Sequence, residues 1–296
     1  LWICDPVEEN IAATQRDARV ARVFADYPAG LRERPDLVWV CTPNRLHAPV
    51  AIDALRAGAD VFCEKPLADT VEAAQAIADA VEQTGRTFML GYSLRWNPGY
   101  QFMAEAIQAG KIGAVIGGRV RLHGYQSLIV ARTNYRQSEK AALLLDYSHE
   151  IDALRWFLGE IVEAKAFATT LGKREKIISP NIVAGVLRFA GGQVATLQID
   201  YVQRPDVREI DIFADDGMLH YNTGDGFVRC YTGQEGSFED VPGSLPHRDD
   251  YYRREIQSFL DAVDGKCPPV VSVQDGLHVV KAVFALVQSY EESMPA

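Results

Sequence analysis

The stretch Val61-Phe62-Cys63-Glu64-Lys65-Pro66 decides the fold. Its first three residues are apolar and predict a buried strand, which ends on a charged Glu-Lys pair followed by a proline. A second apolar run, Leu37-Val38-Trp39-Val40-Cys41, lies upstream, and a helix is predicted from about residue 46 to residue 57 between the two runs. Strands that alternate with helices of this length predict a parallel sheet with helices on both faces.

The same alternation extends to both sides of this unit. Upstream, Leu1–Cys4 predicts a buried strand and residues 19–24 predict a weaker one. Downstream, Asp69 or Thr70 can cap a helix that ends at Gly85, and residues 87–90 predict a further strand. Residues 1–95 are therefore predicted to form one Rossmann-like domain.

The pattern changes from about Trp96 onward. Helices are expected over residues 97–109 and 144–158, and a helical pair over 252–263 and 277–289. Between them lie strand patterns separated by turn pairs such as Gly191-Gly192, which predict an open, mostly antiparallel sheet. The predicted fold class is α/β, with a second, α+β domain over residues 96–296. The six predicted strands are 163–170, 182–189, 194–201, 208–214, 218–221 and 227–231.

Composition restricts the class of protein. The chain has 296 residues and a formal net charge of −10, which disfavours nucleic acid as a partner. No apolar run is long enough to predict a membrane span. The five cysteines are scattered and show no C-x-x-C spacing, and His220, His247 and His278 show no metal-ligand spacing with a carboxylate. We therefore expect a reduced, cytoplasmic protein with no metal site.

A phosphate-binding loop is missing from the pattern. The sequence G-x-G-x-x-G, which follows the first and central strand of a dinucleotide-binding sheet, does not occur in the chain. Leu1–Cys4, followed by Asp5, resembles the second strand of such a sheet, whose terminal acidic residue binds a ribose 2′-OH. We expect roughly 25–35 further residues upstream, about one strand–turn–helix unit. The alternatives are that Leu1–Cys4 is an ordinary edge strand and that Asp5 only caps the next helix.

Four ordered motifs carry a resemblance to a known family. Together with Asp250-Tyr251 through Phe259 and Pro268 through Gly276, they resemble the glucose–fructose oxidoreductase / inositol dehydrogenase family over essentially the whole chain. The four motifs are Cys41-Thr42-Pro43-Asn44-x-x-His47, Glu64-Lys65-Pro66, Gly91-Tyr92-x-x-Arg95-Trp96-Asn97-Pro98 and Asp146-Tyr147-Ser148-His149-Glu150-Ile151-Asp152.

The resemblance implies an oxidoreductase that uses NAD, with NADP less favoured, on an alcohol or ketone of a sugar, cyclitol or related compound. It implies a cis bond into Pro66 and a homodimer or homotetramer formed through the C-terminal sheet. It places Asn97, His123 and Arg136 near the substrate. The implied cofactor-binding residues are Asp5, Thr42, Pro43, Asn44, His47, Glu64, Lys65, Pro66 and Arg95.

The resemblance also assigns the chemistry. His149 would be the general acid/base, Lys65 the cation that stabilises a developing alkoxide, and Asp146 an orienting residue or substrate ligand. On a continuous helix, Asp146 and His149 would lie about 60° apart and away from the apolar stripe. The alternative is a surface or capping histidine. Family members more often space this Asp and His four apart, and many carry glycines where residues 139–142 read Glu-Lys-Ala-Ala.

A second function class stays open at this point. The altered loop at residues 139–142 and the absent phosphate loop favour a non-catalytic family member that acts as a ligand-binding or regulatory protein. The retained Lys65, His149 and Asp5 favour an enzyme.

Overall fold

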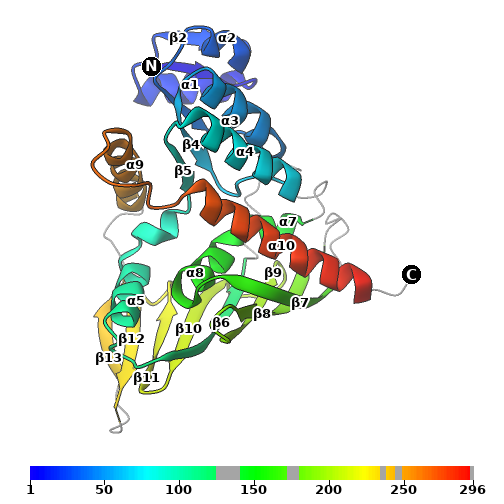
Figure 1. The fold of residues 1–296 in the computed structure, drawn as a ribbon, viewed down its shortest axis with the longest axis vertical. Helices are drawn as coiled ribbons and strands as arrows, with labels where there is room; N and C mark the ends of the chain where they lie inside the picture. The colour runs from blue at the N-terminus through cyan, green and yellow to red at the C-terminus, as the bar shows by residue number, and fades with distance from the viewer. Residues whose placement is uncertain (125–140, 172–179, 234–237, 244–248, 294–296) are drawn as a thin grey trace.

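The computed structural model describes residues 1–124, 141–171, 180–233, 238–243 and 249–293. A smaller unit of helices and short parallel strands lies at one end of the molecule, and a large sheet lies at the other (Figure 1). The helix α10 (Val273–Ser293) passes between them and contacts α4 and β5 on one side and α8 and β7 on the other.

The core of the N-terminal unit is a parallel sheet of three strands in the order β3-β4-β5. Thr70 caps α4 by accepting a hydrogen bond from the backbone N–H of Ala73 at 3.1 Å, and Gly85 ends it with a φ of 62°. These local signals are the ones that predicted this helix. The elements are β3 (Leu37–Val40), β4 (Asp60–Glu64), β5 (Phe88–Gly91), α3 (His47–Arg56) and α4 (Val71–Thr84).

The first two strands form a separate sheet. β1 (Trp2–Cys4) pairs in parallel with β2 (Arg22–Phe24), and within the described ranges no ladder joins either strand to β3. Two helices accompany them, α1 (Glu8–Asp17) and α2 (Tyr27–Leu31), of which α2 was not predicted.

The C-terminal sheet has eight strands in the order β13-β12-β11-β10-β6-β9-β8-β7. All neighbours pair antiparallel except β6 and β9, which are parallel. The six predicted strands are present, while β6 and β13 were not predicted. The strands are β6 (Val115–His123), β7 (Ile161–Thr169), β8 (Ile182–Phe189), β9 (Val194–Asp200), β10 (Val207–Ala214), β11 (Gly217–Asn222), β12 (Phe227–Thr232) and β13 (Phe238–Pro242).

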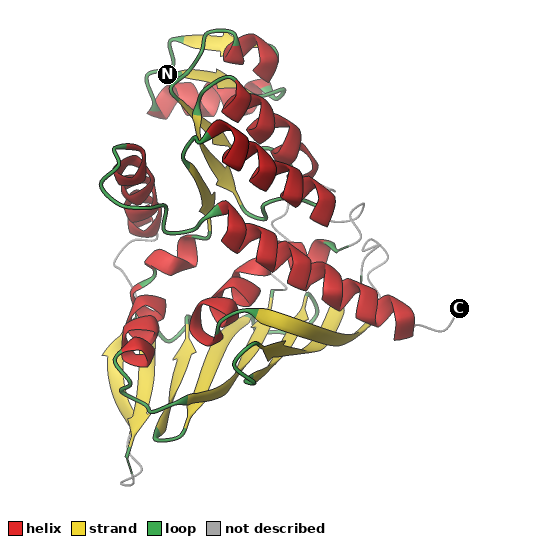
Figure 2. Cartoon of the chain, in the orientation of Figure 1, coloured by secondary structure: helices red, strands yellow, loops and turns green. Residues whose placement is uncertain are grey.

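Helices cover one face of this sheet and leave the other open (Figure 2). Along β8, Val183, Leu187 and Phe189 face the helices and are buried, whereas Val186 is exposed. Phe167 on β7 is 76% exposed on the open face. The covering helices are α5 (Pro98–Gln108), α8 (Ser148–Leu158) and α10.

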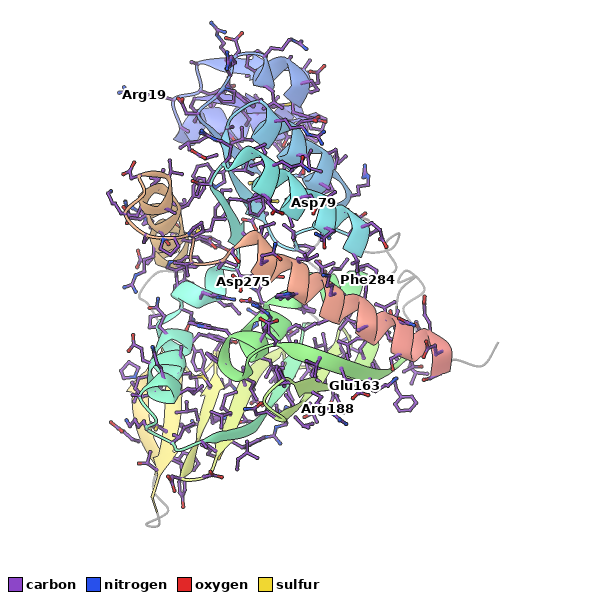
Figure 3. All side chains as sticks on the ribbon, in the orientation of Figure 1. Arg19, Asp79, Glu163, Arg188, Asp275 and Phe284 are labelled. Atoms are coloured by element: carbon purple, nitrogen blue, oxygen red, sulfur yellow. The ribbon has the colours of Figure 1, made fainter. Side chains whose placement is uncertain are left out.

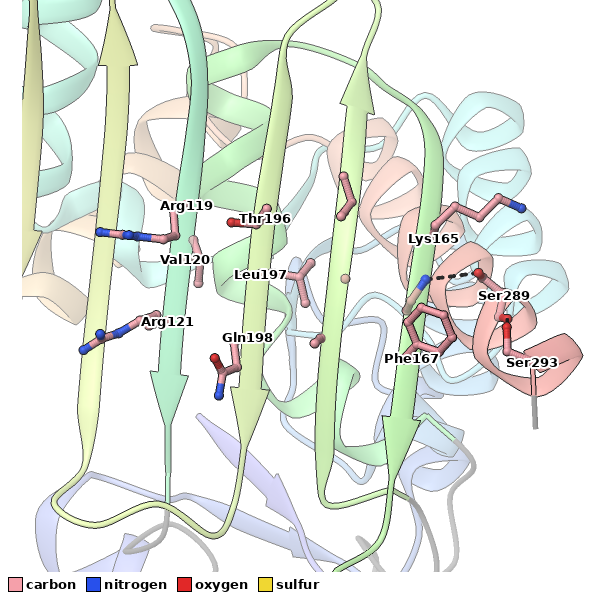
Figure 4. Close-up of a pocket in the computed structure, with 14 residues that line it drawn as sticks. Arg119, Val120, Arg121, Lys165, Phe167, Thr196, Leu197, Gln198, Ser289 and Ser293 are labelled. Carbon is pink, nitrogen blue, oxygen red and sulfur yellow. Dashed lines mark hydrogen bonds between the residues drawn. The ribbon is translucent and has the colours of Figure 1, made fainter. Parts of the chain in front are cut away.

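The open face holds a hollow of about 770 Å³ lined by Arg119, Lys165 and Phe167, among others (Figure 4). At its rim the backbone N–H of Ala166 donates to Ser289 Oγ at 3.0 Å, which ties β7 to α10. This hollow lies on the sheet, away from the Glu-Lys-Pro turn.

The predicted fold class is confirmed, with parallel Rossmann-like strands followed by a mostly antiparallel sheet. The C-terminal helices also contact the N-terminal unit, because Phe259 of α9 (Asp249–Val263) packs on Trp39 and Phe62 at 5.2 and 5.7 Å between ring centroids. Within the described residues, no helix is long and apolar enough to cross a membrane.

Candidate active site

The carboxyl ends of β3, β4 and β5 meet at one edge of the parallel sheet, where ligands bind in open α/β folds. This edge carries Thr42 after β3, the Glu64-Lys65 pair at the end of β4, and Tyr92 after β5. The Lys65–Pro66 bond is cis, as the resemblance implies. Lys65 therefore lies directly after β4, at the carboxyl edge of the parallel sheet.

Lys65 reaches the second domain. Its Nζ donates a hydrogen bond to the backbone carbonyl of Asp146 at 2.7 Å. Burial lowers the pKa of Lys65, whereas the carboxylates of Asp146 and Glu64 oppose this change. A partly desolvated ammonium with a lowered pKa is suited to donate a hydrogen bond to an oxygen that gains negative charge.

His149 lies in the electrostatic field of Lys65. Burial, then the positive charges of Lys65 and Arg208, lower the pKa of His149 well below its usual range. Its ring contacts Tyr92 edge-on at 5.4 Å between centroids, and its buried Nδ1 has no hydrogen-bond partner among the described residues. The structure thus places a neutral imidazole near a lysine ammonium, and both groups border the edge of the parallel sheet.

The predicted continuous helix over residues 144–158 is wrong. Asp146 ends a short helix, α7 (Ala142–Asp146), and Tyr147, with φ of −105° and ψ of 29°, separates it from α8. Asp146 and His149 therefore do not share one helical face. The Asp146 carboxylate accepts from the Tyr201 hydroxyl at 2.5 Å and does not bond to Nδ1 of His149.

Among the predicted cofactor-binding residues, His47 links two loops at this edge of the sheet. His47 is buried, with Nδ1 2.7 Å from the Pro66 carbonyl and Nε2 2.8 Å from the Thr42 carbonyl. It joins the loop after β3 to the Glu-Lys-Pro turn, and burial lowers its pKa. Pro43 is exposed and Asn44 is buried where the chain enters a short 3₁₀ turn. Their contact with a cofactor stays a prediction.

Two other predicted cofactor-binding residues have contacts within the protein. Arg95 forms a buried ion pair with Asp152, Nη2 to Oδ1 at 2.7 Å, and its guanidinium lies over the ring of Trp156. Asp275, at the start of α10, is 3.7 Å from Arg95 and lies where the two domains meet (Figure 3). Asp5 follows β1, and its Oδ1 accepts from the backbone N–H of Val7 at 2.8 Å. Val7 is the N-cap residue of α1, so Asp5 does not cap this helix.

Two of the three predicted substrate residues, Asn97 and His123, are bonded to groups within the protein. Asn97 caps α5, with Oδ1 accepting from the backbone N–H groups of Gly99 and Tyr100. His123, at the end of β6, is buried with Nδ1 2.6 Å from Asp200 Oδ2. Arg136 lies outside the described residues. Roles in substrate binding stay predictions for all three.

Comparison with known proteins identifies the family. Residues 2–92 match the model of an oxidoreductase family with an NAD-binding Rossmann fold, and residues 100–220 match the GFO/IDH/MocA C-terminal domain. The chain belongs to the GFO/IDH/MocA family.

Several curated members of this family are similar to the chain. Inositol 2-dehydrogenase of Paracoccus denitrificans is 34% identical over 200 residues, which cover 64% of this chain and 56% of that protein. The 1,5-anhydro-D-fructose reductase of Ensifer adhaerens is 26% identical over 264 residues, 86% of this chain and 77% of that protein.

Solved structures of two other proteins share the fold. An oxidoreductase domain protein from Kribbella flavida superposes with a TM-score of 0.88 at 25% identity, covering 98% of this chain and 88% of that one. Levoglucosan dehydrogenase, in complex with NADH and L-sorbose, superposes with a TM-score of 0.89 at 22% identity, covering 98% and 87%.

Three residues of the site in this GFO/IDH/MocA protein were missed by the sequence analysis. Arg208, on β10, pairs with buried Glu150, Nε to Oε1 at 2.8 Å, and acts electrostatically on both Lys65 and His149. Tyr201 follows β9 and bonds to the site from the sheet side. Only Glu150 lies within a recognised motif; the contacts of Arg208 and Tyr201 join residues far apart in the chain and leave no local pattern.

Proposed function

We propose that this chain is an NAD-dependent oxidoreductase that transfers hydride between nicotinamide and a CH–OH group of a sugar, cyclitol or related polyol. The observation that carries the proposal is the approach of Lys65 to the second domain, where Nζ bonds to the Asp146 carbonyl beside His149. Substrate names of the relatives support the polyol class.

The residues at the sheet edge suit the nicotinamide end of the cofactor. Thr42 Oγ1 is buried without a hydrogen-bond partner among the described residues, and Glu64 stands half-buried at the end of the next strand. Both are polar groups able to bind the hydroxyl and amide groups of a nicotinamide riboside. Asp5, at the end of β1, would accept from the adenosine ribose, which favours NAD over NADP.

Nicotinamide supplies the hydride acceptor when it is bound, and the protein handles the proton. His149 is neutral at physiological pH because burial and two nearby cations oppose its protonation. It can accept the hydroxyl proton as the C–H bond breaks. Lys65 would donate a hydrogen bond to the same oxygen. The Tyr92 ring contacts the imidazole edge-on.

Replacement of the two groups tests the proposal. We expect Lys65→Ala and His149→Ala each to lower kcat by about a hundredfold or more, as is usual when an acid–base group is removed. Lys281→Ala is the matched control, because Lys281 is exposed on α10, away from the site and from the open sheet face.

Cofactor binding is measured separately, by NADH titration monitored through the fluorescence of Trp2 and Trp39. Full turnover in either site variant would remove that residue from the mechanism. NADH binding without turnover of any polyol by the wild type would favour the ligand-binding alternative.

We further propose that the open face of the eight-stranded sheet forms the interface of a homodimer or homotetramer in the cytoplasm. Exposed apolar side chains on that face, Phe167 and Val186 among them, support this, and all five cysteines are free, as expected of a reduced compartment. Sedimentation velocity of the protein measures the oligomer, and a monomer at micromolar concentration would contradict the proposal.

A further inference from the structure

We infer that Tyr201 is a positioning residue of the site, which fixes Asp146 and through it the ammonium of Lys65. The inference rests on the proposed function and extends it to a residue on the C-terminal sheet. Two hydrogen bonds carry it: Tyr201 Oη donates to Asp146 Oδ2 at 2.5 Å, and Lys65 Nζ donates to the Asp146 carbonyl at 2.7 Å.

Asp146 joins the two halves of the site. It is the last residue of α7 and is 8% exposed, so its position depends on its protein contacts. Its main chain holds Lys65 and its side chain is held by Tyr201. A short hydrogen bond from a phenol to a carboxylate is charge-assisted and is stronger than one between neutral groups. The bond from Tyr201 therefore helps to fix the residue whose carbonyl anchors Lys65.

Tyr201 is itself rigidly held. It is 1% exposed, and its backbone N–H donates to the Asn181 carbonyl at 3.0 Å. The preceding residue, Asp200, accepts from the N–H groups of Val202 and Gln203 at 2.9 and 2.8 Å, which closes a turn around Tyr201. Hydrogen bonds of the backbone therefore hold the chain at Tyr201 and at the two residues that follow it.

The same ring supports the break between the two helices. Tyr147, the residue that separates α7 from α8, lies with its ring centroid 5.5 Å from that of Tyr201. α8 begins at Ser148 and carries His149 one residue later. Tyr201 therefore contacts both Asp146, whose carbonyl accepts from Lys65, and Tyr147, which lies two residues before His149.

Tyr201→Phe tests the inference, since it removes one oxygen and keeps the ring. The first measurement is the rate at which acetic anhydride labels Lys65, relative to exposed Lys281 on α10, read by mass spectrometry. We expect Lys65 labelling to become several-fold faster, because the anchor of its ammonium is loosened. The second measurement is steady-state kinetics. We expect kcat to fall at least about tenfold, because the variant loses a charge-assisted hydrogen bond that positions the Lys65 anchor. The NADH dissociation constant should stay within about twofold of the wild-type value.

Tyr27→Phe is the matched control. It removes the same atom from another tyrosine–aspartate bond, Tyr27 Oη to Asp53 Oδ2 at 3.0 Å, which lies in the N-terminal unit. We expect Lys65 labelling and kcat to stay at wild-type values in this variant.

The outcomes separate the inference from the proposed function. Faster Lys65 labelling in Tyr201→Phe, in a protein that turns over no polyol, supports the positioning role and refutes the enzyme. Unchanged labelling and unchanged kcat overturn the positioning role in an active enzyme. If Tyr201→Phe does not fold, Asp146→Ala removes the acceptor of the same bond, and unchanged Lys65 labelling there overturns the inference as well.

Discussion

Glu255→Gln should make the protein more stable at alkaline pH and change it little at acidic pH. Glu255, on α9, is 2% exposed, and its Oε1 has no hydrogen-bond partner among the described residues. Burial, with a smaller contribution from the negative charge of Glu64, raises its pKa from 4.5 to about 8. Glutamine keeps the shape of the side chain and cannot ionise.

The magnitude follows from proton linkage. The pKa is higher in the folded state, so this group's stabilising contribution is complete below pH 4.5 and is lost as the pH rises to about 8. At about 1.4 kcal/mol for each tenfold change in proton affinity, Glu255 lowers the free energy of unfolding by about 3.5 kcal/mol between pH 5 and pH 8. The glutamine variant does not lose this free energy of unfolding, because its side chain cannot ionise.

Urea unfolding of wild type and Glu255→Gln at pH 5 and pH 8 measures the difference. We expect the free energy of unfolding of the variant, relative to the wild type, to increase by about 3 to 4 kcal/mol from pH 5 to pH 8. Glu82→Gln, at an exposed position on α4, is the control and should show no such growth. If the free energy of unfolding of Glu255→Gln, relative to the wild type, is the same at both pH values within about 1 kcal/mol, the buried carboxyl does not have a raised pKa.

Two further predictions concern charges at the domain junction and in the site. Arg95→Met should lower the free energy of unfolding by about 3 to 5 kcal/mol, because it leaves Asp152 buried and unpaired. Arg22→Met breaks an exposed ion pair and should lower it by less than about 1 kcal/mol. Equal losses for the two variants in thermal or urea unfolding would contradict this prediction. Lys65→Ala should raise the pKa of His149 towards its ordinary value, since the positive charge of Lys65 helps to lower it. Histidine NMR titration measures this, and an unmoved resonance would show that the two side chains are not neighbours.

The sequence predicted well the features that local chemistry encodes. A capping threonine and a positive-φ glycine gave α4 its bounds, and the apolar run before Glu64 predicted β4 and its charged end. The resemblance placed Lys65 and His149 in one site, and the structure brings them within electrostatic reach. These signals lie within a few residues of the feature they specify.

The remaining features depend on contacts between distant segments. β6 was missed although it lies inside the sheet, because Gly117 and Gly118 weaken its strand pattern, and pairing with β9 and β10 on both sides stabilises it instead. The break at Tyr147 carries no glycine or proline, so a continuous helix was predicted. The neighbouring ring of Tyr201, 54 positions downstream by residue number, could not be read from that stretch.

The parallel pairing of β6 and β9 has a consequence for how this protein can diverge. Both strands finish at the same rim, where His123 stands opposite Asp200, and this rim adjoins Asp146 through Tyr201. Under the proposed function, hydride chemistry and polyol recognition would draw on separate sheets, and the bond from Lys65 to Asp146 is one of the contacts that join them. If that proposal holds, substitutions at the rim of the large sheet would change which alcohol is accepted, while the residues of the dinucleotide half could stay unchanged.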